Sequence, residues 1–147
     1  MRTLYLISVW LHVIAACVWV GGMLFLTVVM LPSLRRFTPD ERRPLILPVV
    51  RRFHRVASIA LLTLAVTGTF NLYRRGIRLG DFFTASWWGS TFGLVVTAKI
   101  ALFVLSAAFV MLHTHVKNPG AGRYFARATL LAGLVMVALA VFIVRPF

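Results

Sequence analysis

Long apolar stretches, separated by short polar segments, dominate the chain. Four of them can be traced, approximately over residues 4–31, 56–73, 90–113 and 124–144. Each approaches or exceeds the roughly 20 residues with which a helix crosses a bilayer. The stretches are continuously apolar, whereas the strands of a membrane barrel alternate apolar and polar residues over about ten positions. The pattern therefore predicts one all-α domain over residues 1–147, an integral membrane four-helix bundle.

The polar segment between the first two stretches contains residues typical of a helix N-terminus. Thr38 is a cap residue, Pro39 occupies the first turn, and Glu41 follows the threonine at the spacing of a capping box. Pro44 and Pro48 then remove backbone donors, so we expect them to interrupt this helix. The sequence therefore predicts a short helical elbow that leads into the second span.

The segment before the third stretch is rich in aromatic and small residues. Trp87 and Trp88 are adjacent, and tryptophan favours the interface between membrane and water, so we expect both side chains there. Gly89 and Gly93 have the small-xxx-small spacing that lets a membrane helix approach a neighbour closely. This spacing predicts close packing of the third helix against another span.

The composition supports a membrane protein and limits the kinds of partner that the chain is expected to bind. Hydrophobic residues make up 61% of the 147 positions, only three residues are acidic, and the mean hydropathy is +0.92. These values exclude an ordinary soluble domain. The formal net charge is +13, but the basic residues flank apolar stretches instead of forming a module with stacking aromatics, so nucleic acid is not expected. The predicted partner is a lipid bilayer with anionic headgroups.

The basic residues are unevenly distributed between the two ends of the predicted bundle. The first and third connecting segments carry ten Lys and Arg residues, and the opposite side carries five. Because cytoplasmic segments of membrane proteins are enriched in Lys and Arg, we expect both termini to face outward.

A histidine lies inside the first apolar stretch. It is His12, one of 32 residues without a formal charge between Arg2 and Arg35. Ionisable groups within a membrane segment usually serve a site. At about 100° per residue, three further candidates return to nearly the same helix face: Trp19, Met23 and Met30. This face of the first helix is therefore the first candidate site.

A second ionisable residue, Lys99, lies inside the third stretch. Counting about 1.5 Å per residue from the outer ends puts Lys99 and His12 at a similar depth, roughly 12 to 14 Å. That depth favours a polar interior cavity over a lysine that extends along the helix to reach water. Asn71 and Tyr5 are candidates for the same outer tier.

A second set of possible metal ligands lies near the predicted cytoplasmic boundary. About 19 residues, a rise of about 28 Å, separate His12 from the inner end of its helix, so His12 cannot share one metal ion with this set. Its members are His54, His113, His115, Met30 and Met111. His113 and His115 point about 160° apart around the helix, so only one of them is expected to face inward, and we favour His113. Lys99, Ser106 and His113 follow one another at steps of seven, and we expect that stripe to face the bundle centre.

The residue types of both tiers fit two cofactors. Thioether sulfur selects Cu(I), and neutral imidazole accepts either oxidation state of copper. The same imidazoles suit haem iron, for which an axial His or Met is usual. No acid–base or nucleophile constellation accompanies them, so we expect a binding protein more than an enzyme, with no catalytic residues.

Several motifs resemble the copper-resistance protein D (CopD) domain family. The stretch PVVRRFHRVASIALLTLAVTGTFNLY has the Arg-Phe-rich start and the Thr-Gly-x-x-Asn end of one helix of that family, here Thr67, Gly68 and Asn71. The stretch SWWGSTFGLVVTAKIALFVL is similar to its helix with Gly before Lys, here Gly93 and Lys99. The opening LHVIAACVWVGG is similar to the first helix of the same family and of HemJ-like membrane proteins, which also combine an intramembrane His and Lys.

The CopD resemblance implies copper handling at the bacterial cytoplasmic (inner) membrane by a multi-pass protein. A periplasmic copper-binding CopC protein would be a partner, and assembly as a homo-oligomer is open. Our first expectation is that His12 receives copper near the outer face and that methionines assist its passage toward His54 and His113. Four spans and a last helix without the acidic residue expected for the family argue for binding over transport.

The HemJ resemblance implies an alternative, a haem b protein for electron transfer or porphyrinogen oxidation. Lys99 favours this alternative, because a cation repels copper but pairs with a haem propionate. A second alternative is a membrane scaffold whose polar residues only join helices.

Overall fold

The computed structural model describes residues 2–115 and 119–144, with side chains at 2–110 and 127–141. Over these residues the backbone is almost entirely helical and contains no strand, which confirms the all-α prediction. The chain forms two compact units, Met1–Gly76 and Ile77–Phe147. Each unit is a pair of long helices.

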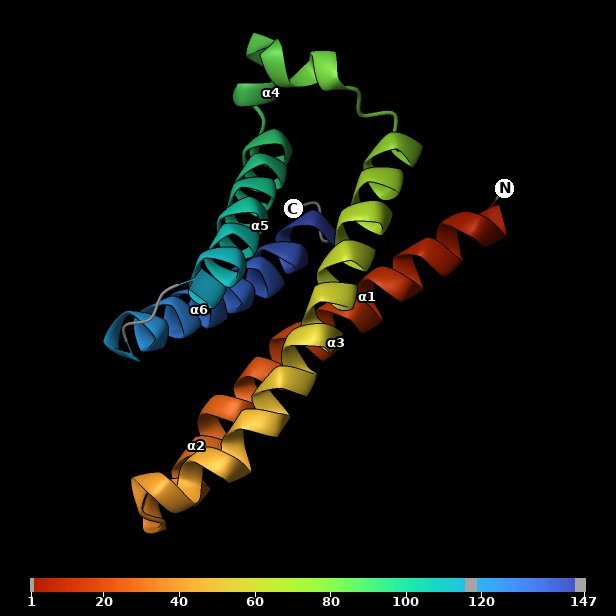
Figure 1. Ribbon diagram of the computed structural model, residues 1–147. Coiled ribbons are helices and arrows are strands. Elements are labelled where there is room, and N and C mark those ends of the chain that lie inside the picture. Colours follow the sequence, from red (N-terminus) through yellow and green to blue (C-terminus); the bar gives the residue numbers. More distant parts are fainter. Residues whose placement is uncertain (1, 116–118, 145–147) are drawn as a thin grey trace. The chain divides into compact units, whose positions relative to one another are not determined.

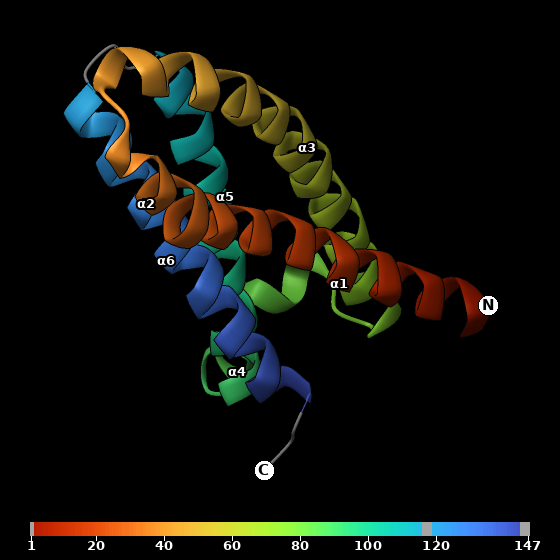
Figure 2. The ribbon, with the colours of Figure 1, turned by 90° about the horizontal axis from the view of Figure 1, so that it is seen from below.

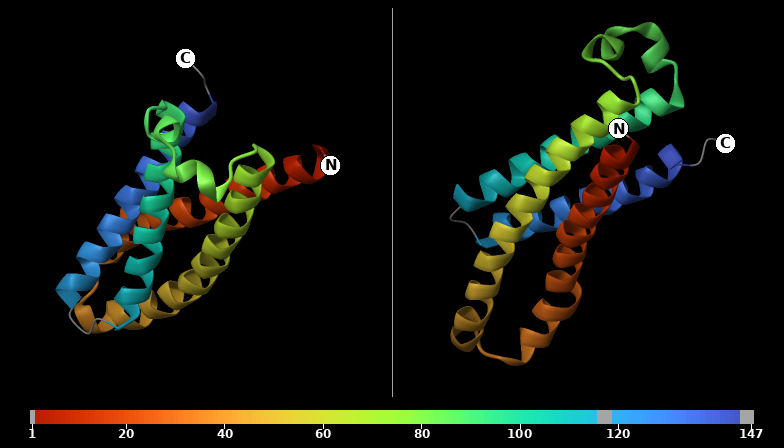
Figure 3. Two further views of the ribbon diagram at one scale, coloured as in Figure 1. Left: turned by 90° about the horizontal axis from the view of Figure 1, so that it is seen from above. Right: turned by 90° about the vertical axis from the view of Figure 1, so that its right-hand side faces the viewer.

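The first unit is an antiparallel helical hairpin (Figures 1 and 3). Helix α1 (Arg2–Leu24) continues through a π-helical segment (Phe25–Met30), the short α2 (Leu31–Ser33) and a 3-10 turn (Leu34–Arg36). The chain then reverses, and α3 (Pro39–Arg74) runs back along α1. The hairpin therefore places the end of α3 beside the beginning of α1.

The predicted capping box at the start of α3 is confirmed. The backbone N–H of Thr38 donates to Glu41 Oε2 over 2.9 Å, and the backbone N–H of Glu41 reaches Thr38 Oγ1 over 3.5 Å. The Thr38 hydroxyl also donates to the carboxylate, over 2.8 Å. The Thr38 backbone and side-chain hydrogen bonds lower the pKa of the exposed Glu41 carboxyl. The ionised carboxylate thus stabilises the first turn of α3.

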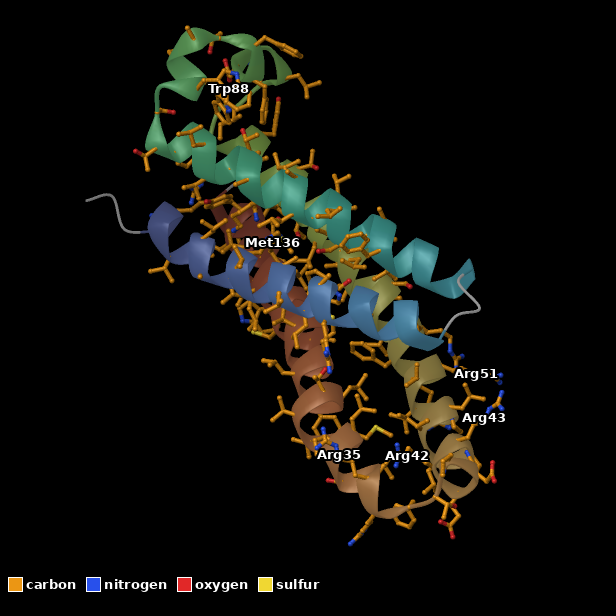
Figure 4. The ribbon with its side chains drawn as sticks, turned by 90° about the vertical axis from the view of Figure 1, so that its left-hand side faces the viewer. Arg35, Arg42, Arg43, Arg51, Trp88 and Met136 are labelled. Carbon is orange, nitrogen blue, oxygen red and sulfur yellow. The ribbon has the colours of Figure 1, made fainter. Side chains whose placement is uncertain are left out.

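Arg42 joins the beginning of α3 to the end of the preceding helical segment. Its guanidinium donates to the carbonyl of Leu34 over 3.0 Å and to that of Phe37 over 3.1 Å. These carbonyls lie where the first helical segment ends, so Arg42 adds a side-chain donor there, beside the backbone N–H of Phe37 that reaches the Leu34 carbonyl. Figure 4 shows Arg42 between the two chain segments, while Arg43 and Arg51 point away from them. Arg42 therefore fixes the turn, and its neighbours remain at the surface.

Helix α3 is one continuous element of 36 residues, and the expected interruption at Pro44 and Pro48 is wrong. Each proline removes one backbone donor, but the prolines are four residues apart, so the two missing bonds lie on one face of the helix. The helix curves instead of breaking (Figure 2). At 1.5 Å per residue it extends over about 54 Å, more than the roughly 30 Å of a bilayer core.

A glycine of α1 lets the two helices of this hairpin approach each other. The Phe53 ring of α3 lies against Gly22 so closely that a Cβ on Gly22 would collide with the ring. A Cβ on the preceding Gly21 would meet nothing within 4 Å. Only the second glycine of the pair is therefore required by the helix contact.

We expect Gly22→Ala to destabilise the hairpin, by about 1–3 kcal/mol, because the added methyl displaces the Phe53 ring. Gly21→Ala is the matched control and should leave stability unchanged or slightly raised, since alanine favours helix. Thermal unfolding midpoints in detergent measure both. In a double variant, Phe53→Leu should recover part of the loss, and equal midpoints for the two single variants would contradict the contact.

The second unit begins with two short elements and ends in another hairpin. A 3-10 segment (Leu79–Phe83) and α4 (Ala85–Trp88) precede α5 (Thr91–His115) and α6 (Pro119–Val144). Helices α5 and α6 lie side by side (Figure 1). The described buried residues of this pair include Val96, Ser106, Thr129, Leu130, Ala132 and Met136; Figure 4 labels Met136.

The two adjacent tryptophans have different environments. Trp87 is buried, and its indole N–H donates to Thr97 Oγ1 over 3.0 Å. The Phe82 ring lies 4.5 Å and the Phe92 ring 6.2 Å from the Trp87 ring, centroid to centroid. Trp88 is half exposed, with its N–H on the Phe82 carbonyl (Figure 4). Trp88 thus fits the expected interface position, whereas Trp87 belongs to the core.

Gly93 has a close contact that its spacing did not predict. A Cβ on Gly93 would collide with the carbonyl oxygen of Trp87 and lie 2.8 Å from Ser90 Oγ, so the described contact is with the preceding turn. The Gly93 N–H in turn donates to the Ser90 hydroxyl oxygen over 3.0 Å. The described contact that requires glycine here is with the backbone of the preceding turn. Close packing of Gly93 against another span stays a prediction.

Gly93→Ala should therefore lower the thermal unfolding midpoint, because a backbone carbonyl cannot move aside without breaking the turn. Gly89→Ala is the matched control, since its nearest atom would be the Ala85 carbonyl at an ordinary 3.5 Å. Tryptophan fluorescence would follow Trp87, whose environment should change in the first variant only. A Gly93→Ala protein as stable as the Gly89→Ala protein would contradict this explanation.

Three described helical segments are long and apolar enough to cross a membrane: Arg2–Arg36, Pro39–Arg74 and Thr91–Val110. Within α6, the described part Arg127–Val141 is a shorter apolar helix. Large apolar side chains remain exposed along these helices, for example Trp10, Ile59 and Leu62. Length and composition thus indicate a membrane protein. The single bundle and the outward termini stay predictions.

Candidate functional site

The side chain of His12 contacts the second helix of its hairpin. Its Nδ1 lies 2.8 Å from the Thr67 hydroxyl of α3. Thr67 Oγ1 lies 2.6 Å from the backbone carbonyl oxygen of Thr63, one turn earlier. The histidine that the sequence singles out therefore faces a protein neighbour.

These two distances determine which nitrogen of His12 carries a proton. A carbonyl oxygen only accepts, so the Thr67 hydroxyl donates its single hydrogen to Thr63. Thr67 Oγ1 must then accept from His12, and Nδ1 is the protonated nitrogen. In the neutral ring the basic lone pair is consequently on Nε2, the atom able to bind a metal ion.

Gly68 provides space for the imidazole. A Cβ at this position would lie 3.3 Å from His12 Cε1, which is tighter than most Cβ contacts, and an ordinary 3.8 Å from Nδ1. Because Gly68 has no side chain, the edge of the ring that carries Cε1 and Nδ1 lies close to α3, where Nδ1 meets the Thr67 hydroxyl. Thr67 therefore positions His12 by a hydrogen bond, and Gly68 leaves the space that the imidazole occupies.

Two more polar residues lie one helical turn from His12 and Thr67, toward the beginning of α1. Ser8 precedes His12 by one turn, and Asn71 follows Thr67 by one turn. Ser8 is buried, as is the side-chain oxygen of Asn71, and neither Ser8 Oγ nor Asn71 Oδ1 has a hydrogen-bond partner. Asn71 on α3 and the half-buried Tyr5 on α1 thus lie on the same side of His12 along the hairpin, and their place in an outer tier stays a prediction.

The predicted face of α1 is confirmed at Trp19 and interrupted farther along. Trp19 is buried, with 2% of its surface exposed. Met23 is half-buried next to Gly22. Met30 ends the six-residue π-helical segment, whose wider turns displace it around the axis from the position that continuous α-helix predicts. The spacing argument therefore applies to Trp19 and Met23, but not to Met30.

His54 is far from His12, as the two-tier interpretation expects. Thirteen residues separate it from Thr67, which amounts to about 20 Å along α3. Among the described residues, no group of three His, Cys, Asp or Glu could hold a metal ion together. The side chains of Met111 and His113 lie outside the described residues, so that part of the inner tier stays a prediction.

In the second unit, Ser106 belongs to the stripe of α5 that the spacing predicts to face the bundle centre. It is fully buried, and its Oγ has no hydrogen-bond partner. Lys99, two turns earlier, is half-buried. The expectation that Lys99 and His12 share one cavity concerns both units and stays a prediction.

Sequence reasoning did not assign roles to Thr63, Thr67 and Ser8 around His12. Thr67 was visible only as part of a family-like motif. Ser8 lies four residues before His12, so helical spacing alone would have placed it on the same face. Thr63 acts through its backbone carbonyl, which no side-chain pattern reveals.

Together, the fold and this site define an all-helical protein with apolar helices and one oriented histidine on a helical hairpin. No family model matches the chain, and no solved structure matches it significantly. An uncharacterized protein of Aquifex aeolicus (strain VF5) is 40% identical over 74 residues. That match covers 50% of this chain and 49% of the relative. It assigns neither a function nor a family.

Proposed function

We propose that this chain is a membrane haem b protein for electron transfer, with Nε2 of His12 as an axial ligand of the iron. The observation that carries the proposal is the chain of hydrogen bonds from His12 Nδ1 through Thr67 to the Thr63 carbonyl. Metal-binding histidines usually donate their other ring N–H to a fixed acceptor, which sets the tautomer and raises the basicity of the ligand nitrogen.

The spacing of donors favours haem over copper transfer. A copper path needs several ligands at each level, but Met23 is eleven residues from His12, about 16 Å along α1, and His54 is farther away. A haem brings four nitrogen ligands itself and requires one or two axial ligands from proteins. His12 can supply one of these without help from the inner tier.

The residues around His12 would orient and shield such a ligand. Thr67 fixes the tautomer, Gly68 leaves room for the ring, and the buried Trp19 adds an apolar layer two turns away. When bound, haem would supply a one-electron couple within the apolar part of the protein. The proposed location is the bacterial cytoplasmic membrane, with both termini outside, from the distribution of Lys and Arg.

The test is an absorption spectrum of the protein purified from membranes in mild detergent, with elemental analysis of the same sample. We expect a Soret band, α and β bands that sharpen with dithionite, and iron in proportion to protein. Stoichiometric copper without these bands would support the CopD-like copper function instead. Neither metal would support the scaffold interpretation.

A further inference from the structure

Two buried oxygens near His12 lack hydrogen-bond partners. Ser8 has 8% of its surface exposed, and its Oγ is unpartnered. The Asn71 Oδ1 is likewise buried and unpartnered. Buried polar atoms in proteins are satisfied with few exceptions, and ordered water satisfies many that lack a protein partner. The two atoms therefore indicate a ligand that can donate and accept hydrogen bonds.

The register of the hairpin brings the two atoms to one level. His12 of α1 lies opposite Thr67 of α3, and the helices are antiparallel (Figure 3). One turn back on α1 leads to Ser8, and one turn forward on α3 leads to Asn71, both toward the same end of the hairpin. The two oxygens are not hydrogen-bonded to each other, because each lacks a partner.

The surroundings are polar on one side of His12 and apolar on the other. Tyr5 lies one turn beyond Ser8, toward the end where α1 begins. In the opposite direction, the buried residues of the hairpin are all apolar: Ala15, Trp19, Val20, Ala57, Ala60, Leu61 and Leu64. Water could thus be held between His12 and one end of the hairpin only.

We propose that Ser8 and Asn71 hold ordered water that connects His12 with the solvent at the end of the hairpin where α1 begins. Water donates to Asn71 Oδ1 and exchanges hydrogen bonds with the Ser8 hydroxyl, which satisfies both atoms. The apolar layer around Trp19 and Leu64 closes the route toward the other end. Water and protons therefore reach the imidazole region from one side of the membrane.

This inference rests on the proposed crossing of the membrane by the hairpin, but not on the identity of the cofactor. It holds for haem, for copper and for the protein without either, because Ser8 and Asn71 need water in each case. An absorption spectrum of the same preparation reports on haem separately. Failure of the haem proposal would consequently not change the result of the experiment below.

The experiment measures the reaction of single cysteines with a charged, membrane-impermeant methanethiosulfonate. The background is the full chain with Cys17→Ala, since Cys17 is an exposed free thiol. Ser8→Cys and Asn71→Cys test the route, Tyr5→Cys is the control near its opening, and Leu64→Cys and Ala15→Cys test the buried apolar layer. The cysteine thiolate, which forms where water reaches the sulfur, attacks the thiol sulfur of the reagent, so that a mixed disulfide forms and methanesulfinate leaves.

We expect Ser8→Cys and Asn71→Cys to react at least about tenfold faster than Leu64→Cys and Ala15→Cys. The two vesicle preparations are right-side-out and inverted. Ser8→Cys and Asn71→Cys should react in the preparation in which Tyr5→Cys reacts, and not in the other one. Each variant is compared only if its thermal midpoint matches that of the Cys17→Ala background. Reaction at Tyr5→Cys without reaction at positions 8 and 71 would overturn the water route. Reaction at positions 8 and 71 from both sides would overturn its one-sidedness.

Discussion

His12→Ala protein is expected to purify without a Soret band, a loss of haem of about tenfold or more, because the iron loses its proposed axial ligand. The substitution removes the imidazole but leaves Thr67 hydrogen-bonded to Thr63, so the hairpin retains its other contacts. Circular dichroism and the thermal midpoint show whether the variant folds. Absorption at the Soret maximum, per protein, measures the effect.

Two controls separate ligation from folding in this experiment. Met136→Leu replaces a buried side chain of the second unit by one of similar size, and its haem content should equal that of the unchanged protein. Added imidazole should restore part of the Soret band to His12→Ala protein by entering the space of the missing ring. A folded His12→Ala protein with full haem content would remove His12 from the site.

Thr67→Val is expected to weaken haem binding by about 10- to 100-fold, the usual effect of losing the group that orients a metal-binding histidine. Valine has the shape of threonine but cannot accept the Nδ1–H of His12, so the tautomer and the ring orientation are no longer fixed. Titration of the protein with haem, followed at the Soret maximum, gives the affinity. Thr67→Ser should recover most of it, because serine keeps the hydroxyl.

The neighbouring Thr63 provides the matched control. Its hydroxyl donates to the Ile59 carbonyl, and only its backbone oxygen contacts Thr67. Thr63→Val should therefore bind haem like the unchanged protein, although it alters the same helix one turn away. If Thr63→Val and Thr67→Val weakened binding equally, the loss would reflect helix stability, and the proposed orientation of His12 would be contradicted.

Much of the fold follows from hydropathy and local spacing. The apolar runs predict the helices, and the capping box at Thr38 and Glu41 forms with the expected partners. The prediction at Pro44 and Pro48 is wrong, because two missing backbone bonds on one face curve a long helix without ending it. The π-helical segment before Met30 was also not predictable from spacing, since the periodicity argument assumes one helix type throughout.

The candidate site was also predictable only in part. Helical spacing places His12 and Trp19 on one face, and Trp19 is indeed buried. Spacing on a single helix cannot show which residue of another helix meets His12. Thr67 contacts it because the turn at Thr38 sets the antiparallel register of α1 and α3. The role of the Thr63 carbonyl follows from that contact and from the geometry of the helix.

By itself, the sequence determined an all-helical protein with helices able to cross a membrane, and it identified His12 as the exceptional residue. Those properties depend on composition and on periodicity within one segment, which local physics sets. The tertiary structure alone decided the partner of His12, the tautomer of its ring and the unpartnered oxygens of Ser8 and Asn71. These depend on the register between two helices, which the turn at Thr38 sets together with side-chain contacts between positions distant in the chain, such as Phe53 against Gly22.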